Sequence, residues 1–166
     1  MLSYELMLKA AGALLLFASA GIWTAKNKRV GRERLLRLRG QIAFVGFVRE
    51  RIERYLLPIS PIIKECDKTV SDAVVIGCDS VDYRDIEGLR ALLRTGRYYS
   101  DAGKEFDSFL SALGASYRED ELVGCDACIK ELSALYQKLS VEIPKDEKSH
   151  AVLAFCLSAA IVIILF

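Results

Sequence analysis

The chain has 166 residues with 23 basic and 22 acidic side chains, which leaves a formal net charge of +1. This balance argues against the strongly basic surface that attracts nucleic acid and against a general affinity for anionic ligands. The charge is segregated, because residues 10–25 and 149–166 carry none and nearly all of it lies between Lys26 and Lys148. This distribution indicates a charged domain with an apolar anchor at each end.

The first apolar segment, residues 6–25, can cross the ~30 Å hydrocarbon core of a bilayer as a helix if Lys9 extends to the interface. Trp23 lies near its inner end, where an amphipathic ring prefers the headgroup region. A cleaved signal peptide is the alternative, since residues 18–20 (Ala-Ser-Ala) resemble a cleavage site. The basic residues that follow, opposed only by Glu33, favour the anchor and predict that the next segment stays in the cytosol. They are Lys26, Lys28, Arg29, Arg32, Arg34, Arg37 and Arg39.

The second apolar segment, residues 149–166, has no polar face beyond Ser158 and lies at the lower edge of the spanning length. We expect it to be a second span that leaves the C-terminus outside the cytosol. Small residues four apart occur in both segments and would permit close helix contact. These pairs are Gly21 with Ala25 and Ala154 with Ser158.

Residues 26–148 read as a series of helices, and no stretch shows the alternation of a strand. An apolar stripe predicts one long helix that continues from the first span to Pro58, and Ser60-Pro61 is predicted to open a second. Shorter helices are expected at about residues 85–94 and 101–113, followed by glycines. The stripe is Leu35, Leu38, Ile42, Val45, Ile52 and Tyr55.

The last helix of the middle segment is expected to begin with a capping box from Ser116 to Glu119 and to end at Pro144. Its apolar residues alternate at spacings of three and four, which is typical of a seam that packs on another helix. They are Leu122, Cys125, Ile129, Leu132, Tyr136 and Leu139. The predicted fold is an all-α soluble bundle at 26–148 flanked by transmembrane helices at 6–25 and 149–166.

Five cysteines, an odd number, are interpreted as reduced thiols in a cytosolic compartment. Residues 125–128 (Cys-Asp-Ala-Cys) have the spacing of a redox pair, but that chemistry places a thiolate at a helix N-terminus and this pair lies inside a predicted helix. A zinc site would need two more ligands, for which Cys66 and Cys78 are irregularly spaced. Buried structural thiols are therefore favoured over redox or zinc chemistry.

No phosphate-binding loop occurs among the eleven glycines, and the single histidine, His150, lies at the edge of the second apolar segment. A catalytic triad in the middle segment is therefore not expected. The sequence predicts a protein that is not an enzyme, with no catalytic residue, no cofactor and no metal.

Several motifs follow one another in a characteristic order: residues 7–12 at the start of the first span, the arginine-rich stretch, residues 52–59 (Ile-Glu-Arg-Tyr-Leu-Leu-Pro-Ile), residues 113–122, and residues 139–145 before the apolar tail. This order resembles the stage III sporulation protein AB family of endospore-forming bacteria, particularly its clostridial type. Residues 1–6 would then precede the family's usual start. Two departures are Tyr117, where an acidic residue is expected, and the Cys125/Cys128 pair, which is not a general family feature.

The resemblance implies a soluble domain similar to the cytoplasmic domain of the inner-membrane platform protein of type II secretion and type IV pilus systems. It also implies a non-enzymatic scaffold subunit of the channel complex that links mother cell and forespore. The chain would lie in the mother-cell membrane around the forespore, with both termini outside the cytosol, among other membrane subunits and docked to a partner secretion ATPase. From charge and expected exposure alone, we expect the partner-facing or lipid-facing residues to be Arg32, Arg37, Arg39, Arg118, Glu119 and Asp120.

Other functions remain open at this point. One is a two-span helical scaffold of another bacterial assembly, and another is a membrane-tethered thiol protein that uses Cys125 and Cys128. A secreted domain after signal cleavage is a third. A homo-oligomer is compatible with the scaffold readings, and we expect no nucleic-acid partner because the basic run beside a span more simply sets topology and contacts anionic lipid.

Overall fold

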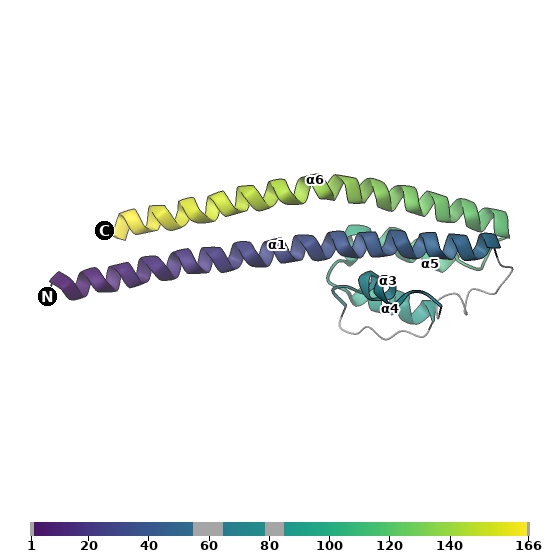
Figure 1. Cartoon of the computed structure of the whole chain (residues 1–166), viewed down its shortest axis with the longest axis horizontal. Coiled ribbons are helices and arrows are strands. Elements are labelled where there is room, and N and C mark those ends of the chain that lie inside the picture. The colour runs from purple at the N-terminus through teal and green to yellow at the C-terminus, as the bar shows by residue number, and fades with distance from the viewer. Residues whose placement is uncertain (1, 55–64, 79–84, 166) are drawn as a thin grey trace. The chain divides into compact units, whose positions relative to one another are not determined.

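The computed structural model describes the backbone of residues 2–54, 65–78 and 85–165; the side chains of residues 2–6, 8, 10, 100, 101, 164 and 165 lie outside this description. Within these ranges the chain is all-α, as predicted (Figure 1). The elements are α1 (Leu2–Arg54), α3 (Lys68–Val74), α4 (Ile86–Thr95), the short π-helix η1 (Tyr99–Gly103), α5 (Lys104–Ala112) and α6 (Arg118–Leu165). They form two compact units: unit 1 combines Met1–Arg32 with Ser140–Phe166, and unit 2 is Glu33–Leu139.

Unit 1 is an antiparallel pair made of the first part of α1 and the last part of α6, so both chain ends lie at the same end of this unit (Figure 1). Phe17 stacks on Phe155 with ring centroids 6.4 Å apart. Trp23 meets His150 edge-on at 5.8 Å. From the first contact to the second the residue number rises from Phe17 to Trp23 on α1 and falls from Phe155 to His150 on α6. The two contacts therefore define an antiparallel register.

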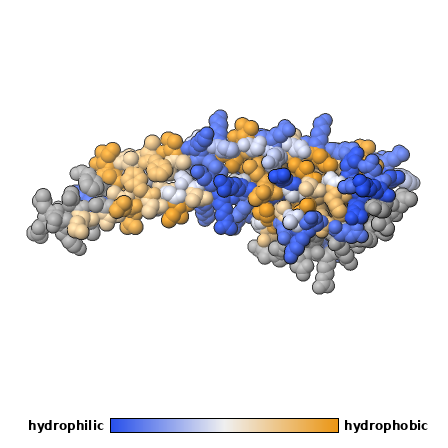
Figure 2. All heavy atoms as spheres, viewed as in Figure 1, coloured by the Kyte–Doolittle hydropathy of each residue, from blue (hydrophilic) through white to orange (hydrophobic). Residues whose placement is uncertain are grey.

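Among the described residues in the apolar part of unit 1, the two that are buried are small, whereas many large apolar side chains face outward. Ala20 and Ser158 are 8% and 7% exposed, and the Ser158 hydroxyl donates to the Ala154 carbonyl at 2.8 Å. Of the expected small residues, only Ser158 is buried. A β-carbon on Gly21 would meet nothing within 4 Å and Ala25 is exposed, so the expected contact of Gly21 and Ala25 is wrong and Ala20 is the buried small residue on α1. Nine of the described large apolar side chains of unit 1 are more than half exposed, and Figure 2 shows the apolar surface of this part of the chain. They are Met7, Leu14, Leu15, Ile22, Val141, Val152, Leu153, Leu157 and Ile163.

Among the described residues, no helix contains a stretch that is long and apolar enough to cross a membrane. Each predicted span, 6–25 and 149–166, extends into residues whose side chains lie outside the description. Both spans therefore stay predictions.

The core of unit 2 forms where α1 meets the shorter helices and α6. Phe44 of α1 and Phe106 of α5 are fully buried and make a T-shaped pair with centroids 5.9 Å apart. The apolar stripe predicted for α1 is buried at Leu38, Val45 and Ile52. Phe44 and Val48 are buried as well, which the stripe did not include, because α1 contacts more than one helix. The predicted seam on α6 is confirmed, with its most buried residues being Cys125, Leu132 and Leu139.

Aspartates cap the N-termini of α3 and α4, because their carboxylates satisfy amides that have no partner within the helix. Asp67 accepts from the Thr69 amide at 2.8 Å, and Asp85 accepts from the Gly88 amide at 2.7 Å. The helix expected at 85–94 is confirmed as α4, and the one at 101–113 appears as η1 followed by α5. The expected start at Ser60-Pro61 lies outside the described residues.

Two expectations for α6 are wrong. The helix does not end at Pro144 but continues through it to Leu165. A proline removes one intrahelical hydrogen bond, and here the turns on both sides maintain the helix despite that loss. The capping box is also misplaced, because Glu121 rather than Glu119 reaches back and accepts from the Gly114 amide at 2.7 Å.

Candidate functional site

The candidate site lies in unit 2, at the turn from α5 into α6. Gly114 has a φ of 88°, which permits a sharp reversal that a residue with a side chain rarely adopts. Arg118 then donates from Nε to the Ile52 carbonyl at 3.1 Å and from Nη2 to the Glu53 carbonyl. Carbonyls in the last turn of a helix have no partner within it, so Arg118 joins the end of α1 to the start of α6.

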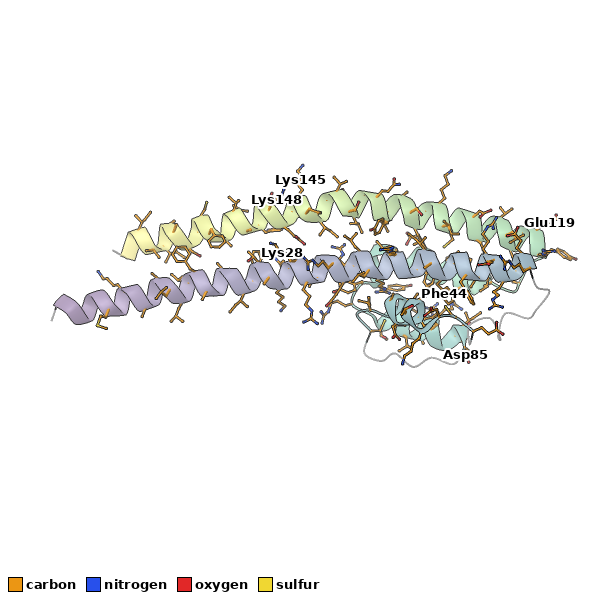
Figure 3. All side chains as sticks on the ribbon, viewed as in Figure 1. Lys28, Phe44, Asp85, Glu119, Lys145 and Lys148 are labelled. Carbon is orange, nitrogen blue, oxygen red and sulfur yellow. The ribbon has the colours of Figure 1, made fainter. Side chains whose placement is uncertain are left out.

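A shallow depression of about 630 Å³ opens at this turn, lined by Tyr117, Arg118, Glu119, Asp120 and Leu122. Tyr117 is 87% exposed. Glu119, labelled in Figure 3, and Asp120 are exposed and make no ion pair with another described residue. Their carboxylates lie in the first turn of α6, where the helix dipole stabilises negative charge. The turn therefore presents an aromatic ring beside two exposed carboxylates that form no ion pair with a described residue.

Of the six residues expected to face a partner or lipid, the structure brings Arg118, Glu119 and Asp120 together at this depression. Arg32 is exposed on unit 1, and Arg39 is exposed on α1 within unit 2. The expectation for Arg37 is wrong, because this residue is only 2% exposed. Position 37 lies on the inner face of α1 beside the buried Leu38, so its guanidinium does not reach the surface.

The sequence reasoning missed a polar line on the inner face of α1, formed by Glu33, Arg37 and Gln41. The Tyr98 hydroxyl donates to Glu33 Oε2 at 2.8 Å, and burial together with this bond raises the pKa of Tyr98. Gln41 is 1% exposed, and its amide has no hydrogen-bond partner among the described residues. The spacing of four residues between these polar side chains could have predicted the line, since residues four apart share one face of a helix.

The two cysteines of the candidate redox pair are both buried as free thiols in α6. Burial, with smaller contributions from nearby carboxylates, raises the pKa of Cys125 to about 11 and that of Cys128 to about 12. Because the thiolate is the reactive form, these values oppose redox chemistry near neutral pH. Among the described residues, no three side chains of the metal-binding types gather into a ligand group.

The groups at the start of α6 are suited to contact with another protein, since aromatic rings are enriched in protein interfaces and carboxylates attract a basic partner surface. No protein family model matches the sequence, and neither a curated protein nor a solved structure matches it.

Proposed function

We propose that the chain is a non-enzymatic platform subunit, anchored by two membrane helices, of the channel complex that links mother cell and forespore during endospore formation. Unit 2 lies in the cytosol of the mother cell and docks a partner secretion ATPase. Both chain termini lie on the other side of the membrane.

The inverted arrangement of unit 1 is the observation that carries the membrane anchor. A helix pair in water buries its large apolar side chains, whereas this pair encloses Ala20 and Ser158 and exposes Leu14, Leu157 and Ile163. In a bilayer the hydrocarbon covers the large side chains, and helices associate through small residues that allow close approach. This supports spans at 6–25 and 149–166, with the basic residues after the first span keeping unit 2 in the cytosol.

The sporulation assignment rests on the order of the motifs, and one contact supports it. Ile52 and Glu53 belong to one motif of the resemblance, and Arg118 belongs to another that lies more than sixty residues later. Arg118 hydrogen-bonds to the carbonyls of both residues. Motifs that meet in the fold have a structural reason to occur together.

The docking surface that we propose for the ATPase is the turn at the start of α6. Glu119 and Asp120 form no ion pair with a described residue and Tyr117 is exposed, so a basic surface of the partner can bind without first breaking an ion pair within the described part of the chain. The sequence contains no phosphate loop, which fits a subunit that relies on its partner for nucleotide hydrolysis.

Co-purification tests the proposal. A tagged full-length chain is solubilised in detergent from sporulating cells, and its partners are identified by mass spectrometry. We expect recovery of a secretion ATPase with other membrane subunits, and loss of the ATPase with the double variant Glu119→Lys/Asp120→Lys. The matched control is Glu105→Lys/Glu131→Lys, which reverses two other exposed carboxylates of unit 2 and should retain the ATPase.

Each other outcome has a distinct meaning. Recovery of a different membrane assembly would replace the sporulation channel with a two-span scaffold of that assembly. Equal recovery of the ATPase with both double variants would reject the docking turn but keep the platform. Loss of function in a folded Cys125→Ala/Cys128→Ala variant would favour the thiol protein instead.

A further inference from the structure

Basic side chains from two distant segments meet at one level of unit 1. A β-carbon placed on Gly31 would lie 2.5 Å from Ile143 Cγ2 and 2.8 Å from Glu147 Oε1, which aligns this part of α1 with residues 143–147 of α6. Figure 3 labels Lys28, Lys145 and Lys148 at this level. We name this group the basic collar, and its members are Lys26, Lys28, Arg29, Arg32, Lys145 and Lys148.

The charge of the basic collar is largely uncompensated. Residues 26–32 contain no acidic side chain, and residues 143–150 contain only Asp146 and Glu147. All six members are exposed, and all except Arg29 lack an ion pair with a described residue. Residues 26–32 rise about 9 Å along the helix, which is close to the Debye length of about 8 Å at physiological salt. The four charges on α1 therefore lie within about one Debye length of one another, and Lys145 and Lys148 lie at the same level on α6.

The basic collar adjoins the apolar part of unit 1 at an aromatic contact. Trp23 is 45% exposed and packs against His150 at 5.8 Å. An indole ring prefers the headgroup level of a bilayer. Figure 2 shows the apolar surface giving way to hydrophilic residues along unit 1. This sequence of surfaces matches a membrane that changes from hydrocarbon to headgroup.

We propose that the basic collar binds the headgroups of anionic phospholipids in the cytosolic leaflet, and that α6 contributes to this site through Lys145 and Lys148. The proposal rests on the membrane anchor of the proposed function. Clusters of four to eight basic residues beside a membrane helix attract anionic lipid, and the two helices together provide six. The phosphate carries the charge that the ammonium and guanidinium groups bind.

Trp23 is the only tryptophan and lies at the edge of the collar, so its fluorescence reports the surrounding lipid. The full-length chain is reconstituted into phosphatidylcholine vesicles, and quenching by bromine-labelled phosphatidylglycerol is compared with quenching by bromine-labelled phosphatidylcholine. We expect stronger quenching by the anionic lipid. Lys145→Gln/Lys148→Gln should lower this preference several-fold, with about fivefold per lysine as the upper bound. The control Lys104→Gln/Lys130→Gln removes the same charge from exposed positions of unit 2 and should not change it.

Alkaline extraction of the vesicles separates the two proposals. A chain that resists extraction but is quenched equally by both lipids overturns the lipid site and leaves the anchor standing. A chain that is extracted overturns the anchor and the lipid site together. Equal quenching combined with RNA binding that Lys145→Gln/Lys148→Gln abolishes would overturn the lipid site and assign the basic collar to nucleic acid.

Discussion

Two glycines of α1 should respond in opposite directions to the same substitution. A β-carbon on Gly40 would lie 2.6 Å from Ala73 Cβ and 2.9 Å from the Ala73 carbonyl carbon, so α1 and α3 must move apart. A β-carbon on Gly46 would meet nothing within 4 Å. Replacing a helical glycine with alanine stabilises the helix by about 1 kcal/mol. Overpacking costs about 1–3 kcal/mol, and a clash with backbone atoms lies at the upper end of that range.

We therefore expect Gly46→Ala to stabilise unit 2 by about 1 kcal/mol and Gly40→Ala to destabilise it by about 1–2 kcal/mol. Hydrogen exchange of the full chain in detergent, followed on peptides of α1 and α3, measures the free energy of opening. Exchange should slow about fivefold in Gly46→Ala and accelerate about five- to thirtyfold in Gly40→Ala. If Gly40→Ala slowed exchange as much as Gly46→Ala, the close packing of α3 on α1 would be refuted.

Two further predictions concern buried groups of unit 2. Asp107 is 8% exposed and accepts hydrogen bonds from Arg90 Nε at 2.7 Å and from Arg94 Nη2 at 2.9 Å. Asp107→Asn should therefore lower the free energy of unfolding by about 2–4 kcal/mol, measured by urea unfolding in detergent. The control Glu87→Gln removes an exposed ion-pair partner of the same Arg90 and should lower the free energy of unfolding by no more than about 0.5 kcal/mol. Equal losses of stability in Asp107→Asn and Glu87→Gln would contradict the reasoning. Burial raises the pKa of Asp107, but the hydrogen bonds from Arg90 and Arg94 outweigh burial and hold it below the ordinary value. The stability from this group is therefore present above about pH 4 and is lost as the pH falls through the lowered pKa. The raised pKa values of Cys125 and Cys128 predict slow alkylation by iodoacetamide at neutral pH in the folded chain and rapid alkylation in urea. Peptide mapping measures the alkylation of each thiol. Rapid alkylation of either thiol in the folded chain would show that it is accessible to solvent.

Features that depend on neighbouring residues could be predicted from the sequence. The all-α class, the helix that Asp85 begins and the seam through Cys125 and Leu132 follow from periodicity and capping, which act over a few residues. The errors in α6 arose where a local signal met a stronger effect. Pro144 weakens a helix locally, but the turns on both sides maintain it. The capping box was expected to use Glu119, whereas the carboxylate that accepts a hydrogen bond from an amide at this turn is that of Glu121, and the amide is that of Gly114.

The candidate sites could be predicted only in part. Glu119 and Asp120 could be predicted to be exposed because charged residues in the first turn of a helix usually are. The role of Arg118 could not, because its acceptors, the carbonyls of Ile52 and Glu53, lie on another helix. Arg37 was misassigned because its charge suggested exposure, whereas its position on α1 buries it.

By itself, the sequence determined the helical class, the extent of α4 and the separation of charged from apolar segments, because these properties follow from the order of residues along one helix. Only the tertiary structure decided which faces meet. It buries small residues between the two helices of unit 1, and it adds Lys145 and Lys148 to the basic residues that begin at Lys26. The register between helices depends on the fit of side chains from both, and neither segment alone contains that information.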